Sequence, residues 1–230
     1  RIAAMCAISG KTADALAQLK SENPDDYAPL ASTADAFPSS FTDSPLGQIP
    51  DGWEVRPIND IINRLSVNKR YTKKQVEQYG KVPVYEQGAS ILLGYHDHDP
   101  SLKASPQQPK FIFGDHTCVT HLSCHDFDIS QNVIPVEGKS RPTMWVYYAI
   151  QGKQLFQEYR RHWSEFIVKD VCIAPEETCK IYADLVTNFY IKKEQAILEN
   201  QSLAETRDVL LPKLLSGEID VSALSNMEDL

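Results

Sequence analysis

The densest group of side chains that could do chemistry lies in the segment GDHTCVTHLSCHDFD, residues 114–128. Its candidate metal ligands are Asp115, His116, Cys118, His121, Cys124, His125, Asp126 and Asp128. A zinc site needs three or four such ligands to converge tetrahedrally. On a strand, His116 and Cys118 would share one face and His121 would lie on the other, and the segment lacks CxxC and HExxH spacing.

We therefore favour a structural role for this segment, in which Asp115 and Thr117 satisfy a turn and His116 forms a hydrogen bond or faces a ligand. The competing function is that of a metal-dependent hydrolase using His116, Cys118, His121, Cys124 and His125. The sequence predicts no cofactor.

A second segment mixes cations with polar and aromatic side chains: Asn68, Lys69, Arg70, Tyr71, Thr72, Lys73, Lys74 and Gln75. Lysine and arginine bind phosphates or guanine, whereas asparagine and glutamine pair with adenine. The segment is suited to contact DNA, with a solvated helix end as the alternative.

Two further polar groups are candidates for the same surface. The first lies on two extended runs joined by a turn at Gly88 and consists of Tyr85, Gln87, Ser90, Tyr95 and His96. An ordinary hairpin with a buried tyrosine would explain it equally well.

The other group is Lys139 and Arg141, which flank Ser140 and form either a phosphate clamp or a wet loop. We assign the run from Arg160 to Trp163 to a helix end, where cations are favoured without any ligand, and Trp53 to packing.

Charge is distributed unevenly along the chain. The 230 residues carry a net charge of -8, but residues 51–175 contain 15 Lys and Arg against 14 Asp and Glu. The near-neutral middle could present a local positive face, although solvated helix faces would have the same composition.

Cysteine usage and hydropathy suggest a compartment. Five cysteines without a CxxC pair indicate reducing conditions. No apolar run reaches the 18 residues of a membrane span. We expect a soluble, cytoplasmic protein that does not interact with membranes, and the initial Arg1 suggests an excised fragment.

The elements that must position these residues indicate an α+β fold. Residues 1–48 are predicted to form a linker with short helices, including Thr12–Lys20. Residues 49–174 are predicted to form a compact β-rich domain, because short extended runs alternate with glycine turns. Its predicted strands are Val82–Tyr85, Ile91–Tyr95, Pro109–Phe113, Val119–Leu122 and Val133–Val136, and its predicted helices are Asn68–Gln78 and Pro142–Tyr159.

The C-terminal part predicts one very long helix from Ala174 to Ile219, with residues 220–230 as a flexible tail. Pro175 suits a first helical turn. Apolar residues recur every seven positions, as in a coiled coil. The predicted seam contains Phe189, Tyr190, Ala196, Ile197, Asn200, Leu203, Ala204, Arg207, Leu210 and Leu211, with Lys193, Asn200 and Arg207 as polar interruptions that restrict register and partner.

Three stretches together resemble the specificity (S) subunits of type I restriction-modification systems. SPLGQIPDGWEV at residues 44–55 resembles the start of a target-recognition domain. VPVYEQGASILLGYHDHDP at 82–100 and FIFGDHT at 111–117 resemble the interior of one subclass. LAETRDVLLPKLLSGEI, ending at residue 219, resembles the end of the conserved long helix.

Residues 1–43 resemble the connector after the central helix, so the resemblance implies the C-terminal half of an S subunit. It departs at Cys118, where similar sequences commonly carry arginine.

The resemblance also implies a function. An S subunit has no catalytic centre; each recognition domain reads one half of a split DNA target, and two long helices pair antiparallel as a spacer. Those helices dock adenine methyltransferase (M) subunits, through which endonuclease (R) subunits join. For this chain we therefore expect binding to double-stranded DNA, docking of M subunits on residues 175–219, and a homodimer through that helix. A coiled-coil scaffold without DNA contact is a further alternative.

Overall fold

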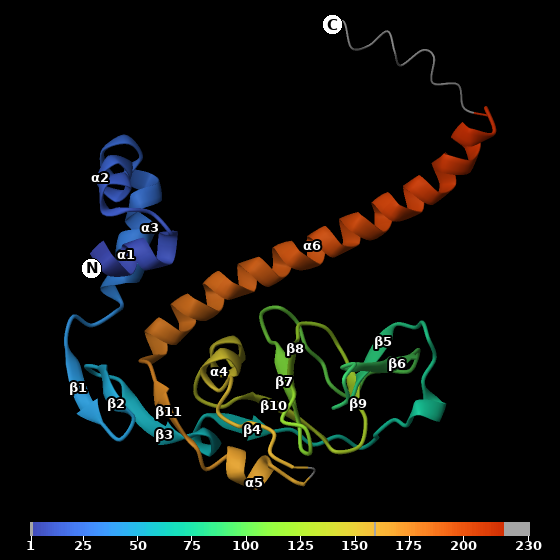
Figure 1. Cartoon of the computed structure of the whole chain (residues 1–230), viewed down its shortest axis with the longest axis horizontal. Helices are drawn as coiled ribbons and strands as arrows, with labels where there is room; N and C mark the ends of the chain where they lie inside the picture. The colour runs from blue at the N-terminus through green and yellow to red at the C-terminus, as the bar shows by residue number, and fades with distance from the viewer. Residues whose placement is uncertain (1, 159, 219–230) are drawn as a thin grey trace, which may run out of the picture. The chain divides into compact units, whose positions relative to one another are not determined.

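The computed structural model describes residues 2–158 and 160–218 and confirms that the chain mixes helices with β-sheets (Figure 1). The chain divides into two compact units, residues 1–187 and 188–230. Each unit is described here by itself. Within the described residues, no helix combines the length and apolar character needed to cross a membrane.

Residues 2–35, within the predicted linker with short helices, form three short helices that pack together. They are α1 (Ile2–Ser9), α2 (Ala13–Glu22) and α3 (Pro24–Asp35). The Thr12 hydroxyl accepts a hydrogen bond from the Ala15 N–H and so caps α2. Met5 and Leu16 pack with small alanines into a core of their own, which short alanine-rich helices permit because they approach closely.

The resembling stretch at residues 44–55 spans a hairpin and the first strand of the main fold. Strands β1 (Phe41–Ser44) and β2 (Gly47–Pro50) pair antiparallel. Strand β3 (Glu54–Pro57) then pairs antiparallel with β11 (Asp170–Ile173), the last strand before the long helix. This ladder joins the two ends of residues 54–173, which we call the sheet region.

A four-stranded antiparallel sheet in the order β4-β10-β7-β8 forms one half of the sheet region. Its strands are β4 (Ile62–Arg64), β7 (Lys110–Gly114), β8 (Thr120–Ser123) and β10 (Val133–Gly138). A 3-10 turn at Ile58–Asp60 leads into β4.

A three-stranded sheet in the order β6-β5-β9 forms the other half. Strands β5 (Val82–Tyr85) and β6 (Leu92–His96) pair antiparallel, whereas β9 (Asp128–Ile129) runs parallel to β5. All five predicted strands are therefore present to within two residues.

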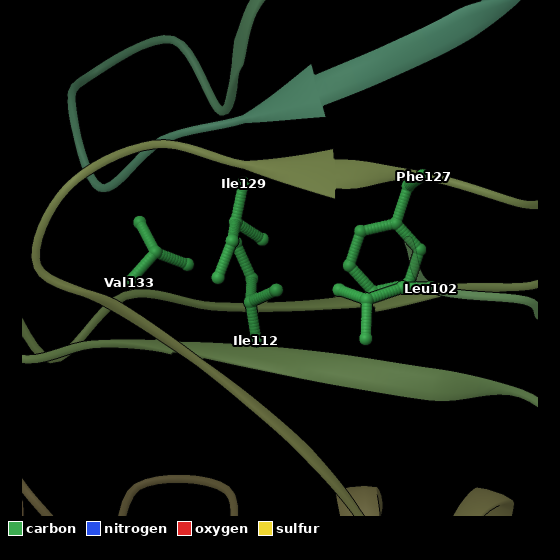
Figure 2. Packing of buried hydrophobic residues seen from close by; sticks show 5 residues of the cluster. All are labelled: Leu102, Ile112, Phe127, Ile129 and Val133. Atoms are coloured by element: carbon green, nitrogen blue, oxygen red, sulfur yellow. The ribbon is translucent and has the colours of Figure 1, made fainter. Parts of the chain in front are cut away.

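The two sheets share an apolar core (Figure 2). Ile112 comes from the four-stranded sheet and Ile129 from the three-stranded sheet, and Leu102 and Phe127 fill the space beside them. Val133 and Ile129 lie at the two ends of the turn that carries the chain from one sheet to the other, and both are completely buried. The core thus holds both ends of that turn.

The predicted helix Asn68–Gln78 is wrong. The segment is irregular, with a 3-10 turn at Lys73–Gln75 and isolated bridges at Tyr71 and Glu77, because its backbone pairs with distant segments. The Tyr71 N–H donates to the Ile129 carbonyl, and the Glu77 N–H donates to the Tyr95 carbonyl. These tertiary hydrogen bonds replace the helical ones.

The predicted helix Pro142–Tyr159 is much shorter than expected. Helix α4 covers Thr143–Ala149, and Gly152 then adopts a positive φ of 70°, a conformation that favours glycine and interrupts the helix. A second short helix, α5 (Trp163–Phe166), follows. Tyr159 lies outside the described residues.

Helix α6 (Glu176–Leu215) is drawn as one unbroken helix in Figure 1. It contains 40 residues and so is about 60 Å long at 1.5 Å per residue. Its first turns belong to the first unit, where Thr178, Cys179 and Ala183 are buried. Pro212 lies inside the helix, which ends before Gly217 with a φ of 74°. The predicted end at Ile219 lies outside the described residues.

Candidate nucleic-acid interface

Three arginines from separate segments meet around one hollow of the sheet region, which we call the arginine hollow. Its volume is ≈ 320 Å³, and Arg64, Arg70 and Arg161 line it together with Gln131 and Asn132. Arg64 is the last residue of β4, and Arg70 lies between β4 and the 3-10 turn at Lys73–Gln75. Arg161 lies just before α5. An anionic ligand could meet all three guanidinium groups here.

Arg70 has both a structural and an electrostatic role. One guanidinium nitrogen donates to the carbonyls of Ser130, at 2.9 Å, and Val133, at 2.7 Å. Burial, and to a smaller degree the positive charge of Arg64, lowers the pKa of the Arg70 guanidinium. Two like charges are thus held near each other, an arrangement that a bound anion would relieve.

The other two arginines remain available at the surface. The Arg64 guanidinium lies 5.8 Å from the centre of the Trp163 ring, within the range of a cation–π interaction. The Arg161 side chain is 79% exposed, and its Nε lies 3.9 Å from a carboxylate oxygen of Asp115. Such a weak exposed contact leaves most of its charge uncompensated.

Asp115 organises this edge of the hollow. Its carboxylate accepts a hydrogen bond from the Trp163 N–H at 3.0 Å, and its backbone carbonyl accepts one from the His162 N–H at 2.8 Å. It therefore caps α5 from a distant strand end and positions Arg161 and Trp163. Asp115 lies in the predicted turn, but its carboxylate accepts from another segment. The buried Thr117 hydroxyl has no hydrogen-bond partner among the described residues, so these side chains do not satisfy the turn as predicted.

The remaining candidate metal ligands do not meet. Across the described residues, no three His, Cys, Asp or Glu side chains lie close enough to share a metal ion. His116 lies in the turn before β8 and Cys118 just after that turn, whereas His121 lies on β8, so the predicted strand alternation does not apply to them. Cys118 itself has a positive φ of 58°.

Three of the cysteines, Cys118, Cys172 and Cys179, carry little nucleophilic character. Burial raises the pKa of the Cys118 and Cys172 thiols, and it raises the pKa of Cys179 to about 11. Because the thiolate is the reactive form, these side chains stay mainly protonated and unreactive at neutral pH.

A second hollow, which we call the polar hollow, adjoins the first and has a volume of ≈ 580 Å³. Thr72, Lys73, Gln87 and Ser90 contribute to its lining, and Gln131 lines both hollows. Residues from the two predicted DNA-contact groups thus lie around one surface, which continues into the arginine hollow.

The predicted DNA-contact segment is divided between surface and core. Asn68, Lys69, Lys73 and Lys74 are exposed. Tyr71 is 2% exposed and stacks on His96, with ring centres 4.3 Å apart. A side chain this deeply buried belongs to the core and does not present itself to DNA.

His96 also belongs to the core, contrary to the prediction. Its Nε2 lies 3.0 Å from a carboxylate oxygen of Asp128, and its Nδ1 accepts a hydrogen bond from the His98 N–H. The Asp128 carboxylate also accepts from the Ser101 N–H. The histidine and aspartate therefore satisfy one another in the interior.

Other predicted contacts have mixed positions. The Gln87 side-chain carbonyl accepts a hydrogen bond from the His116 N–H at 2.9 Å, so these two residues brace adjacent loops. Tyr95 is half-buried within β6. DNA contact by these three residues stays a prediction.

Lys139 and Arg141 do not reach the arginine hollow. Lys139 is exposed, whereas the Arg141 Nε donates to the Ala174 carbonyl at 3.1 Å. Arg141 thereby supports the start of α6, while a phosphate clamp with Lys139 stays a prediction.

The outer part of α6, residues 188–215, which we call the outer helix, exposes apolar side chains. Phe189, Leu203 and Leu210 are 62%, 59% and 41% exposed. Ala196, Asn200 and Arg207 are also exposed, and Tyr190 is half-buried. The side chain of Ile197 lies outside the described part. The exposed positions leave a seam available, while pairing itself stays a prediction.

Sequence reasoning missed Arg64, Gln131 and Asn132, and it assigned Arg161 to a helix end. One usable signal was the asparagine between two short strands, because asparagine tolerates the left-handed conformation of tight turns. The convergence of the arginines depends on contacts between distant segments, which spacing along the chain does not reveal.

Comparison with known proteins identifies a relative of the whole chain. The HindI specificity subunit, from a type I restriction enzyme of Haemophilus influenzae, is 28% identical over 249 aligned positions. The alignment covers 95% of this chain and 54% of that protein. Over nearly its whole length, this chain is similar to a type I restriction enzyme specificity subunit. It spans about half the length of that curated relative, and no family model matches it.

Solved structures of specificity subunits resemble the fold. The S subunit of a type I system from M. genitalium has a TM-score of 0.52 and 14% identity, with coverage of 93% of this chain and 55% of that chain. The HsdS subunit from Thermoanaerobacter tengcongensis has a TM-score of 0.40 and 14% identity, with coverage of 90% and 55%. The first of these supports a shared arrangement of helices and sheets.

Proposed function

We propose that this chain recognises double-stranded DNA as one half of a type I specificity subunit and has no catalytic centre of its own. Homology to specificity subunits supports this role. The observation that carries it is the arginine hollow, where three cations from separate segments converge beside exposed amides. Arginines supply phosphate contacts, whereas amides read base edges.

Net acidity does not oppose this proposal. The chain carries -8 overall, but the arginines act at short range on a surface where Asp115 is the acidic lining residue. At physiological salt the Debye length is about 8 Å, so distant acidic residues contribute little at the hollow. Local charge thus governs the encounter with a phosphate backbone.

We extend the proposal to the complex in which such a subunit works. In that complex, methyltransferase subunits dock on α6 and endonuclease subunits join through them. The exposed apolar side chains of the outer helix, including Phe189 and Leu203, support a protein partner there. A second copy of the chain is the partner that we propose in the absence of the other subunits.

The experiment that tests DNA recognition is salt-dependent binding of the full chain to a duplex. Replacing Arg64 and Arg161 together by Ala should reduce the slope of log affinity against log salt by about 2, because each lost phosphate contact removes about 1. Replacing Lys11 and Lys20 by Ala is the matched control, since it removes two positive charges from the first unit outside the sheet region.

An unchanged slope in the arginine variant, or equal losses in the two variants, would contradict binding at the arginine hollow. Failure of the unmodified chain to bind any duplex at low salt would contradict DNA recognition altogether. The coiled-coil scaffold would then be the better function.

A further inference from the structure

The turn Ser130–Val133 displays two amide side chains between the two hollows. Gln131 and Asn132 are both exposed, both line the arginine hollow, and Gln131 also lines the polar hollow. Within the described residues, neither side-chain amide forms an intramolecular hydrogen bond. Two adjacent amides are thus presented where the cationic surface and the polar surface meet.

The backbone of this turn is held from several sides. The Ser130 and Val133 carbonyls accept from Arg70, and the Asn132 carbonyl accepts from the Asp115 N–H at 2.9 Å. The Ser130 N–H donates to the Tyr85 carbonyl. With completely buried Ile129 and Val133 at its ends, the turn is anchored to both sheets (Figure 2).

The conformation of Asn132 fits this arrangement. Its φ is 59°, a left-handed value that asparagine tolerates better than most residues. A fixed backbone matters here because it limits the conformations of the side chain before binding. A side chain that must form two hydrogen bonds at once then loses less conformational freedom when it binds. Hydrogen bonds thus hold the backbone of the turn, while the amide groups of Gln131 and Asn132 are exposed and can bind a ligand.

We infer that Gln131 and Asn132 are specificity-determining residues that read adenine from the major groove. This inference rests on the proposed function. An amide offers a donor and an acceptor side by side, which matches the adjacent N7 acceptor and N6 donor of adenine. Guanine offers two acceptors on that edge, and phosphate offers acceptors only, so both suit the neighbouring arginines better.

Selection of duplexes from a randomised library by the full chain tests this inference. The unmodified chain should enrich a half-site with at least one fixed adenine. Asn132→Gly, which keeps the left-handed backbone, and Gln131→Ala should each relax preference at a fixed adenine by about 10- to 100-fold, the discrimination expected of one bidentate contact. Gln107→Ala removes an exposed amide elsewhere and should leave the half-site unchanged.

Substituting 7-deazaadenine at the fixed position sharpens the test. This base lacks the N7 acceptor, so it should weaken binding of the unmodified chain. It should have little effect on the variant that lacks the amide proposed to contact that adenine. A similar loss in both proteins would show that the amide does not contact N7 and would overturn the inference.

The two proposals fail differently. Absence of any enriched sequence with the unmodified chain would contradict the proposed function. Enrichment of one motif by the unmodified chain and both variants would overturn only the base-reading role. Equal weakening on every sequence by a folded variant would also overturn it, because that result indicates phosphate contact; circular dichroism establishes that each variant is folded.

Discussion

The sheet region contains a buried apolar core, whereas the described side chains of the outer helix are exposed or half-buried. Phe111, Phe127 and Val133 are completely buried in the sheet region, whose hollows expose cations and amides. The outer helix instead leaves Phe189 and Leu203 more than half exposed. A region with a buried core can present polar side chains to a charged ligand, whereas an exposed apolar stripe on a helix is suited to a protein partner.

The largest expected effect is the loss of stability when a side chain is removed from the buried core of the sheet region. Phe127→Ala should lower the free energy of unfolding by about 3–5 kcal/mol, because it leaves a cavity in the shared core. All three tryptophans, Trp53, Trp145 and Trp163, lie in the first unit, so urea unfolding followed by tryptophan fluorescence reports on it. The control Tyr79→Ala, at a site 79% exposed, should shift stability by less than about 0.5 kcal/mol.

Equal stability of the Phe127 and Tyr79 variants would contradict a packed core between the two sheets. The sheet region and the outer helix would then no longer differ in this respect, since neither would bury its apolar side chains tightly.

A smaller loss is expected from the buried polar pair. Asp128→Ala should destabilise the chain by about 2–4 kcal/mol, because His96 and the Ser101 N–H lose their common acceptor in the interior. The same fluorescence measurement applies. Asp99→Ala, at an exposed carboxylate, is the matched control, and a loss no greater than that of the control would show that the pair contributes nothing.

The smallest effect concerns the outer helix and should leave the sheet region intact. Leu203→Asp should raise the dissociation constant of self-association at least about tenfold, or about 1.4 kcal/mol, by placing a charge in the seam. Analytical ultracentrifugation measures the change, and Ser202→Asp, on a neighbouring exposed position, is the control.

Tryptophan-monitored unfolding of the Leu203 variant should match that of the unmodified monomer. If the unmodified chain stays monomeric at micromolar concentration, the proposed homodimer is wrong, and the exposed stripe would await a different protein.

Much of the fold could be predicted because local pattern and tertiary structure agree in it. Alternating apolar residues give β5 at Val82–Tyr85, and the absence of glycine over a long C-terminal stretch gives α6. The local pattern and the tertiary structure disagree where a segment forms backbone hydrogen bonds with distant strands. Residues 68–78 look helical from composition, yet their N–H groups pair with Ile129 and Tyr95.

The candidate site was only partly predictable for a related reason. Lys73 and Gln87 were identified by their types, but His96 has the same apparent suitability and is paired with Asp128 in the core. Arg64 and Asn132 belong to no recognisable group of polar residues in the sequence. Their place in the candidate site becomes visible only because the fold brings them beside Arg70. Residue type predicts what a side chain could contact, whereas topology decides what it meets.

The ladder between β3 and β11 also bears on the order of folding. It joins the first and last strands of the sheet region, so its loop-closure entropy is large unless the intervening chain has already collapsed. Helix α6 begins shortly after β11, and its Cys179 and Ala183 are buried. We therefore expect the first turns of α6 to pack late in folding, after the preceding sheets have formed.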